Sequence, residues 1–220
     1  MRLRNIPGSR ERIAQSPYVI PEASLPEHRG AWREVFGSDR PIRLEIGMGK
    51  GRFLIDMARQ NPDVSFLGIE KYSSVLIRAL DKREECSDLD NLYFLRMDAA
   101  DLTEVFAPGE ISMIYLNFSD PWPKERHAGR RLPGPLFLDR YRQILPPDGQ
   151  VRFKTDNTGL FAFAVESARS RNWQILSCTE DLHHDPQLCE GNVMTEYEER
   201  FSAAGHPICQ LVLSPPLAAE

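Results

Sequence analysis

A short apolar run that turns through three alternating glycines restricts the fold of this chain more than any other feature. It covers residues 44–51 (LEIGMGKG), and a helical pattern begins directly after it at Phe53. Apolar residues at every second position predict a buried strand, and Gly47, Gly49 and Gly51 predict a tight turn into the helix. Glycines let a ligand approach the backbone closely, and the first turn of a helix offers free N–H groups. The segment therefore predicts a nucleotide-type pocket.

Two carboxylates beside this turn indicate which nucleotide would bind. Glu45 stands two residues before the first glycine, and Glu70 ends the next apolar run at residues 64–70. The dinucleotide fingerprint G-x-G-x-x-G, counted from Gly47, would need a third glycine where this chain has Arg52. A carboxylate before the turn repels a pyrophosphate but suits an amine, and one at a strand end accepts hydrogen bonds from ribose hydroxyls. These features predict S-adenosylmethionine rather than NAD, and a glycine-rich connection without a ligand is the alternative.

Strand and helix patterns alternate along the chain from residue 42. Predicted strands cover residues 42–46, 64–70, 92–97, 111–118, 150–155, 173–179 and 208–213. Predicted helices cover residues 53–60, 73–85, 136–145 and 158–169. This alternation predicts the α/β class, with a doubly wound, mostly parallel, seven-stranded sheet and helices on both faces. In such sheets ligands bind at the carboxyl ends of the strands.

The N-terminal part of the chain has no such pattern. Residues 1–40 are rich in proline and arginine, Arg2 and Arg4 among them, and show no sustained period. We expect a basic, proline-rich arm that allows a short helix at residues 32–36 and becomes ordered on the body or on a partner. Residues 41–220 are expected to form a single domain, because this length suffices for one α/β core.

Acidic residues gather at the predicted strand ends. Those at or just beyond an end are Glu45, Glu70, Asp98, Asp120 and Asp156. Since parallel strands bring their carboxyl ends to one edge, these acids are expected to line a single ligand site. The Asp98 carboxylate could accept a hydrogen bond from an adenine amine, and an N-cap for the helix that follows is the alternative.

The segment NFSDPWP at residues 117–123 is the most specific one in the chain. Its two prolines stiffen the loop, and Trp122 offers a flat stacking surface. Asn117 and Asp120 present polar groups beside the predicted cofactor pocket. These groups suit a flat, amine-bearing substrate such as a nucleobase, and a proline-rich connection around a buried tryptophan is the alternative.

A basic stretch follows this loop directly. The net charge of the chain is −5, but basic side chains cluster here at Lys124, Arg126, His127, Arg130 and Arg131. A local positive potential can follow a phosphate backbone even on an acidic protein. Base-binding groups beside phosphate-binding groups favour RNA or DNA over a free small molecule. A solvated charged loop is the commoner meaning of such a run.

These segments together resemble the bacterial tRNA (guanine-N7-)-methyltransferase family. The resemblance rests on E-x-G-x-G at 45–49, GIE at 68–70, NFSDPWPK at 117–124, RH at 126–127, RRL at 130–132 and TEYE at 195–198. It implies a Rossmann-like class I methyltransferase fold that uses S-adenosylmethionine and methylates a guanine in the variable loop of tRNA. The chain departs from the family pattern at Ser119, where a proline is usual, and at Glu125, where a second lysine is usual.

The resemblance also implies roles for individual residues. S-adenosylmethionine would contact Glu45, Glu70, Asp98 and Asp120, beside Gly47, Gly49, Gly51, Ala99 and Asn117 of the predicted pocket. Asp120 would also be the active-site residue. The substrate would contact Lys124, Asp156, Thr195, Tyr197 and Glu198. The RNA would face Arg126, His127, Arg130 and Arg131.

Methylation at N7 of guanine needs little acid–base chemistry. N7 carries an in-plane lone pair and no proton, so positioning should dominate catalysis. Positive charge moves onto the purine ring, and the Asp120 carboxylate could favour that arrangement. Asp156 and Glu198 could accept hydrogen bonds from guanine N1–H and its 2-amino group. A helix cap and a solvated charge are the respective alternatives.

Two other classes of function stay open on the sequence alone. An NAD(P)-dependent oxidoreductase is opposed by Arg52, and a non-catalytic RNA-binding module on the same fold is opposed by the complete set of acids. Four scattered cysteines without a C-x-x-C pair argue against structural zinc and suit a reducing cytoplasm. We expect tRNA as the partner, neither a membrane nor a metal, and a monomer or homodimer.

Overall fold

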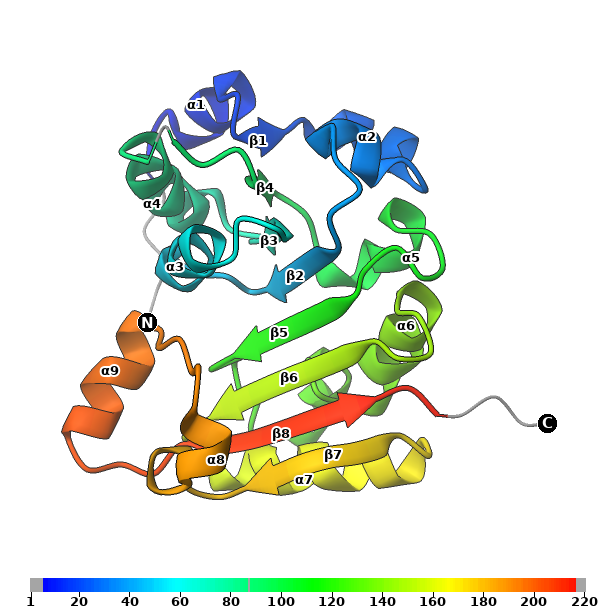
Figure 1. Cartoon of the computed structure of the whole chain (residues 1–220), viewed down its shortest axis with the longest axis vertical. Coiled ribbons are helices and arrows are strands. Elements are labelled where there is room, and N and C mark those ends of the chain that lie inside the picture. The colour runs from blue at the N-terminus through cyan, green and yellow to red at the C-terminus, as the bar shows by residue number, and fades with distance from the viewer. Residues whose placement is uncertain (1–5, 87, 217–220) are drawn as a thin grey trace.

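One sheet runs through the computed structural model, which describes residues 6–86 and 88–216 (Figure 1). Within these residues the strands lie in the order β1-β4-β3-β2-β5-β6-β8-β7. They are β1 (Val19–Ile20), β2 (Ile42–Ile46), β3 (Ser65–Ile69), β4 (Leu92–Leu95), β5 (Met113–Asn117), β6 (Gln150–Thr155), β7 (Gln174–Thr179) and β8 (Cys209–Ser214). β8 is antiparallel to both of its neighbours, and the other neighbouring pairs are parallel. The predicted α/β, doubly wound, mostly parallel sheet is confirmed.

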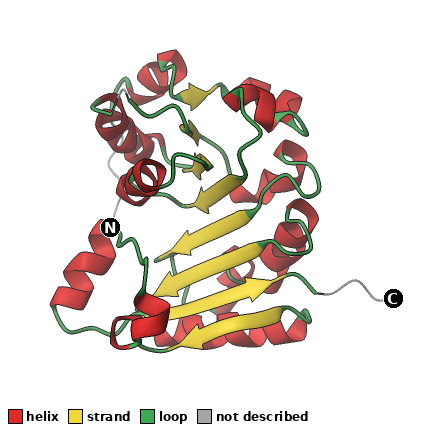
Figure 2. Ribbon diagram, viewed as in Figure 1, coloured by secondary structure: helices red, strands yellow, loops and turns green. Residues whose placement is uncertain are grey.

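Helices cover both faces of this sheet (Figure 2). They are α1 (Ser9–Gln15), α2 (Trp32–Phe36), α3 (Arg52–Gln60), α4 (Ser73–Glu84), α5 (Leu102–Val105), α6 (Pro135–Ile144), α7 (Thr158–Ser170), α8 (Pro186–Cys189) and α9 (Glu196–Ala203). Short 3-10 turns are η1 (Glu22–His28), η2 (Ala99–Asp101), η3 (Glu125–Arg130) and η4 (Leu182–His184). α1 packs on α4, and α3 packs on α4, β3 and β4. α5, α6 and α7 form the second layer, in which α7 packs on β6, β7 and β8.

The inner strands are apolar at consecutive positions because both faces of the sheet are covered. In β3, Phe66 and Leu67 belong to different buried clusters, since neighbouring strand residues point to opposite faces. The cluster of Phe66 includes Leu54 of α3 and Leu76 of α4, and the cluster of Leu67 includes Leu138 of α6. All seven predicted strands are present, and their ends lie within two residues of the predicted ends.

The N-terminal segment contains more structure than its sequence predicts. Residues 6–40 form α1, β1, η1 and α2, and β1 adds an eighth strand beside β4. The indole of Trp32 is fully buried, and its Nε1 donates to the carbonyl oxygen of Val105 at 2.9 Å. The segment thus shares the sheet and the core, while a domain boundary at residue 40 stays a prediction. Arg2 and Arg4 of the predicted basic arm lie outside the described residues.

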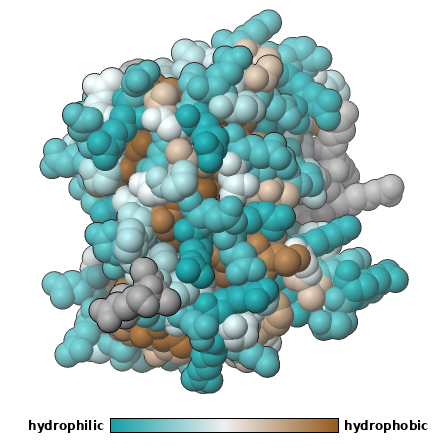
Figure 3. All heavy atoms as spheres, turned by 90° about the vertical axis from the view of Figure 1, so that its right-hand side faces the viewer, coloured by the Kyte–Doolittle hydropathy of each residue, from teal (hydrophilic) through white to brown (hydrophobic). Residues whose placement is uncertain are grey.

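The surface beside α2, α5 and α6 is mostly hydrophilic, with apolar side chains visible between polar ones (Figure 3). Within the described residues, each helix is too short or too polar to cross a bilayer. The same residues hold no group of three or more His, Cys, Asp or Glu side chains arranged to bind a metal ion.

Candidate active site

The predicted acids lie at the carboxyl edge of the sheet. Glu45 is the last residue but one of β2, and Glu70 directly follows β3. Asp120 lies three residues beyond β5. The charge of Asp120 raises the pKa of Glu70, after the larger effect of burial, and the charge of Glu70 adds to the raised pKa of Glu45. Glu70 therefore lies close enough to both Asp120 and Glu45 for their charges to affect one another.

Glu45 is a buried carboxylate, and only one of its two oxygens accepts a hydrogen bond from the described residues. Its side chain is only 2% exposed, and Oε1 accepts a hydrogen bond from Asn117 Nδ2 at 2.8 Å. Oε2 has no hydrogen-bond partner among the described residues. Burial raises the pKa of Glu45 to about 7, although Asn117 and the charge of Lys154 act in the opposite direction. A buried acceptor without a donor is costly, and a ligand cation would satisfy it.

The glycine turn holds the backbone at the rim of a cavity. The N–H groups of Gly47 and Met48 both donate to Ile69 O, at 2.9 and 3.1 Å, and so tie the turn to β3. Gly49 has φ +57°, and a side chain added there would point into open space. No side chain from the described residues caps α3, whose N-cap is Gly51. The turn therefore leaves room for a ligand, and the first turn of α3 behind it carries no side-chain cap.

A cavity of about 530 Å³ opens in front of this turn. The predicted residues that line it are Glu45, Gly47, Gly49, Gly51, Asn117, Thr195 and Tyr197. Phe118 and Arg200, which the sequence analysis missed, line it as well. The other predicted residues lie outside this lining. The structure thus brings the glycine turn of β2, the end of β5 and the start of α9 together around one space.

A second cavity of about 570 Å³ lies over β5, β6 and β8. It shares Phe53 and Asn117 with the first cavity, and Arg43 and Arg152 also line it. Of the predicted site residues only Asn117 borders it.

Asp98 lies at the predicted edge with both carboxylate oxygens engaged. Oδ1 accepts from Ala100 N at 3.0 Å and caps η2, and Oδ2 forms an ion pair with Lys71. Burial would raise the pKa of Asp98, but the bonds from Lys71 and Ala100 lower it overall. Ala99 is buried in the same turn. The N-cap alternative is therefore realised, and a ligand amine would have to share Asp98 with Lys71.

The loop after β5 is shaped by its own side chains. Arg131 donates from Nε and Nη2 to Trp122 O, at 3.3 and 3.2 Å, and its guanidinium lies 4.5 Å from the ring centre of Phe163. The Arg130 guanidinium lies 5.0 Å from the centre of the Trp122 ring. The backbone of Trp122 has a positive φ of +42°. Asp120 itself is exposed. Arg131 thus supports the loop, and Trp122 already has a stacking partner.

The remaining basic side chains of this loop reach solvent. Lys124, Arg126 and Arg130 are exposed, and His127 is half-buried with its ring edge-on to Trp122 at 5.5 Å. Arg131 is the exception in the predicted RNA-facing set, because its side chain is only 11% exposed. In the structure, most basic side chains of this stretch therefore reach solvent, whereas Arg131 packs inside the loop.

Asp156 and Tyr197 meet through a hydrogen bond. Tyr197 Oη donates to Asp156 Oδ2 at 3.1 Å. The Tyr197 ring stacks on Phe201 at 4.0 Å and lies 4.8 Å from Phe118, which has φ +53°. An aromatic wall with a carboxylate beside it therefore borders the cavity.

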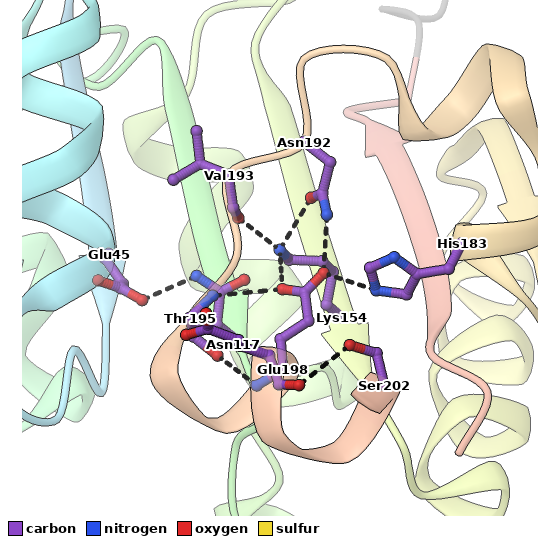
Figure 4. A network of polar contacts seen from close by, with 10 residues as sticks. Glu45, Asn117, Lys154, His183, Asn192, Val193, Thr195, Glu198 and Ser202 are labelled. Atoms are coloured by element: carbon purple, nitrogen blue, oxygen red, sulfur yellow. Dashed lines mark hydrogen bonds and ion pairs between the residues drawn. The ribbon is translucent and has the colours of Figure 1, made fainter. Parts of the chain in front are cut away.

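Thr195 and Glu198 form the start of α9 (Figure 4). Thr195 Oγ1 accepts from Glu198 N at 2.9 Å, and the two residues make a capping box. Glu198 is fully buried; Lys154 Nζ donates to its Oε2 at 2.5 Å and Asn192 Nδ2 donates to its Oε1 at 2.7 Å. Lys154 is a residue that the sequence analysis missed. The signal was available, since an apolar alternation in residues 150–155 places a lysine on one face of a buried strand.

Close approach of α3 and α4 makes Gly51 sensitive to substitution. A Cβ at Gly51 would lie 2.9 Å from Ala79 Cβ of α4, and φ is +74°. Gly51→Ala should lower the free energy of unfolding by about 3 kcal/mol, through the left-handed backbone and overpacking together. Gly109→Ala is the matched control, because it has the same φ and open space around its Cβ. Urea unfolding should show a loss of only about 1 kcal/mol there; equal losses would contradict the steric argument.

The whole chain is similar to known methyltransferases. A family described as "Putative methyltransferase" matches residues 39–211. The tRNA (guanine-N(7)-)-methyltransferase of Lachnoclostridium phytofermentans is 58% identical over 212 residues, which are 96% of this chain and 97% of the relative. The enzyme of the same name from Geobacillus thermodenitrificans is 51% identical over 219 residues, 98% of this chain and 99% of the relative.

Solved structures share the fold. The 16S rRNA methyltransferase KamB superposes with a TM-score of 0.61 at 14% identity, over 85% of this chain and 94% of that chain. A 16S rRNA (adenine(1408)-N(1))-methyltransferase variant from Catenulisporales acidiphilia, solved with its cosubstrate SAM, gives 0.60 at 11% identity, over 89% and 93%. The expected family is confirmed by the closer relatives: the chain belongs to the tRNA (guanine-N(7)-)-methyltransferase family.

Proposed function

We propose that this protein transfers the methyl group of S-adenosylmethionine to N7 of a guanine in the variable loop of tRNA. The observation that carries the proposal is the buried Glu45 Oε2, which has no hydrogen-bond partner among the described residues and stands with Glu70 and Asp120 at the carboxyl edge of the sheet. Relatives that match over nearly the full length are named tRNA (guanine-N(7)-)-methyltransferases.

The cavity residues suit this cofactor. Its ammonium would give the buried Glu45 Oε2 the donor that it lacks, beside Asn117. Glu70 would accept from the ribose hydroxyls, and the open backbone at Gly49 leaves room for the ligand. When bound, S-adenosylmethionine supplies a methyl group attached to a positively charged sulfur. The buried Glu45 carboxylate would repel a pyrophosphate, and Arg52 stands where the dinucleotide fingerprint needs a glycine, so an NAD(P)-dependent oxidoreductase is not favoured.

The side chains around the substrate would bind the guanine and orient its ring. Guanine N7 needs no base, so the side chains must place the ring and favour the charge that it acquires. The exposed Asp120 carboxylate would stabilise that charge electrostatically. Phe118 and Tyr197 offer aromatic surface to a purine, and Asp156 beside Tyr197 would accept from its N–H groups.

The exposed basic side chains of the 124–131 loop would bind the RNA backbone. Lys124, Arg126 and Arg130 are exposed in the loop that follows Asp120, and His127 is half-buried among them. Contacts of this kind give position and affinity but little sequence information. The affinity for tRNA should therefore fall steeply as salt concentration rises.

Methyl transfer from labelled S-adenosylmethionine to unmodified tRNA tests the proposal. The label should appear in tRNA, and aniline cleavage, which cuts the strand at N7-methylguanine, should place it in the variable loop. Asp139→Asn, at an exposed pair with Arg171, serves as the matched control and should keep full activity. Label on an adenine or on ribose would overturn the substrate, and no label from the intact protein would overturn the function.

A further inference from the structure

A buried ion pair between Lys154 and Glu198 holds the first turn of α9 and the segment before it against β6. Lys154 stands on β6 with 5% of its surface exposed, and Glu198 is fully buried. Besides Glu198 Oε2, Lys154 Nζ donates to Asn192 Oδ1 and to Val193 O, each at 3.0 Å. One ammonium therefore holds three acceptors of the 192–198 segment, which Figure 4 shows converging on it.

Both oxygens of Glu198 are engaged in this cluster. Oε2 receives Lys154 and, at 3.4 Å, the N–H of Thr195, and Oε1 receives Asn192 Nδ2. His183 Nε2 lies 3.3 Å from Oε1, and in Figure 4 it stands on the side of Glu198 opposite to Glu45. A guanine could reach Glu198 only if this cluster opened.

The other ion pairs of α9 are exposed and therefore weak. Arg52 pairs with Glu199 at 2.5 Å and Lys50 with Glu196 at 3.6 Å, all of them on the outside of the molecule. Solvent-exposed pairs contribute little, whereas removal of one partner of a buried pair leaves an uncompensated charge in the interior. Among the ion pairs of α9 in the described residues, the one with Lys154 thus contributes most to its position, beside the hydrogen bond from Tyr197 to Asp156.

We propose that Lys154 and Glu198 are positioning residues for methyl transfer: they clamp the 192–198 segment so that Thr195 and Tyr197 form one wall of the cofactor cavity. Glu198 then acts through Lys154 rather than by contact with guanine. The inference rests on the proposed function for what the cavity holds, but the clamp itself concerns only this chain's own residues.

Lys154 also acts on the opposite wall of the cavity. Asn117 donates a hydrogen bond to Glu45. It is also the register partner of Lys154, since β5 and β6 pair at these two residues. The groups that face Glu45 are Asn117, Lys154 and Glu70, and the positive charge of Lys154 favours its ionised form. Removal of that charge should move the pH dependence of cofactor binding to higher pH.

Hydrogen exchange on the ligand-free protein tests the clamp directly. In Lys154→Met, amides of residues 192–203 should exchange about tenfold faster, because the buried Glu198 loses its partner. Amides of β2 and β3 should keep their rates, which separates a local release from general destabilisation. Lys154→Met/Glu198→Met should exchange more slowly than Lys154→Met, since no unpaired charge remains; Asp139→Asn should match the parent protein. Unchanged exchange in Lys154→Met would overturn the proposal.

Cofactor titration without RNA separates the two proposals. In Glu198→Gln, the Kd for S-adenosylmethionine should rise about tenfold, and the kcat at saturating cofactor should stay within about threefold. In Lys154→Met, the pH below which affinity falls should also rise. If Glu198→Gln changes only the KM for tRNA, Glu198 contacts the substrate and the clamp is overturned. If the parent protein binds no cofactor while Lys154→Met still speeds exchange, the proposed function fails and the clamp stands.

Discussion

Glu45→Gln should weaken cofactor binding about 100-fold and yet stabilise the ligand-free protein above pH 7. Burial raises the pKa of Glu45 from 4.5 to about 7, so ionisation of this side chain opposes folding. The stability that the protonated form supplies is fully present below pH 4.5 and is lost as the pH rises through 7. A glutamine stays neutral, so the variant should gain up to about 3 kcal/mol at pH 8 and nothing at pH 4.

Urea unfolding across this pH range measures the effect. The control is Glu166→Gln, an exposed position on α7, which should change stability by less than about 0.5 kcal/mol at every pH. Equal stability of Glu45→Gln and the parent protein at pH 8 would show that the buried carboxylate carries no penalty. That result would remove the main reason to place a cation at Oε2.

Cofactor affinity should show the complementary behaviour. A cationic ligand needs the ionised form of Glu45, so the affinity of the parent protein should fall about tenfold for each pH unit below 7. Glu45→Gln should bind about 100-fold more weakly at pH 8, because a buried charge partner is missing. It should also lose the pH dependence. Calorimetric titration at pH 5.5, 6.5 and 8 checks both expectations, and a pH-independent affinity in the parent protein would contradict them.

Asp120→Ala should lower kcat by about 10²- to 10³-fold, the usual cost of one electrostatic group at a reacting centre. Asp120 is exposed in the loop after β5, so the free energy of unfolding should change by less than about 0.5 kcal/mol. Asp120→Asn keeps the shape of the side chain and loses its charge. Its kcat should lie between those of the parent protein and Asp120→Ala. That pattern would show that the polar contacts of the side chain contribute beside its charge.

Single-turnover methyl transfer with saturating tRNA provides the measurement. Asp139→Asn again controls for removal of a surface carboxylate. If Asp120→Ala transfers methyl groups at the parent rate, the residue has no catalytic role. A rate for Asp120→Asn equal to that of Asp120→Ala would point to the negative charge alone.

The order of elements and the edge that carries the site were readable along the chain. Apolar runs such as residues 64–70 stand between helical patterns, and buried parallel strands need this continuous apolar character. The parallel direction then places every strand end, and so Glu45, Glu70 and Asp120, on one side. β1 could not be predicted in this way, because a strand of two residues has no period to detect.

Side-chain pairing was decided only in three dimensions. Arg131 reads as an RNA contact within a basic run, but the folded loop turns it onto Trp122 and Phe163. Glu198 reads as a surface charge or a guanine contact, but α9 lays it over Lys154, 44 residues earlier in the chain. Sequence by itself determined the fold, the family and the acidic edge, since these follow from local patterns that repeat. The tertiary structure alone decided which charged side chains pair inside the protein and which reach solvent, because that depends on contacts between residues far apart in the chain.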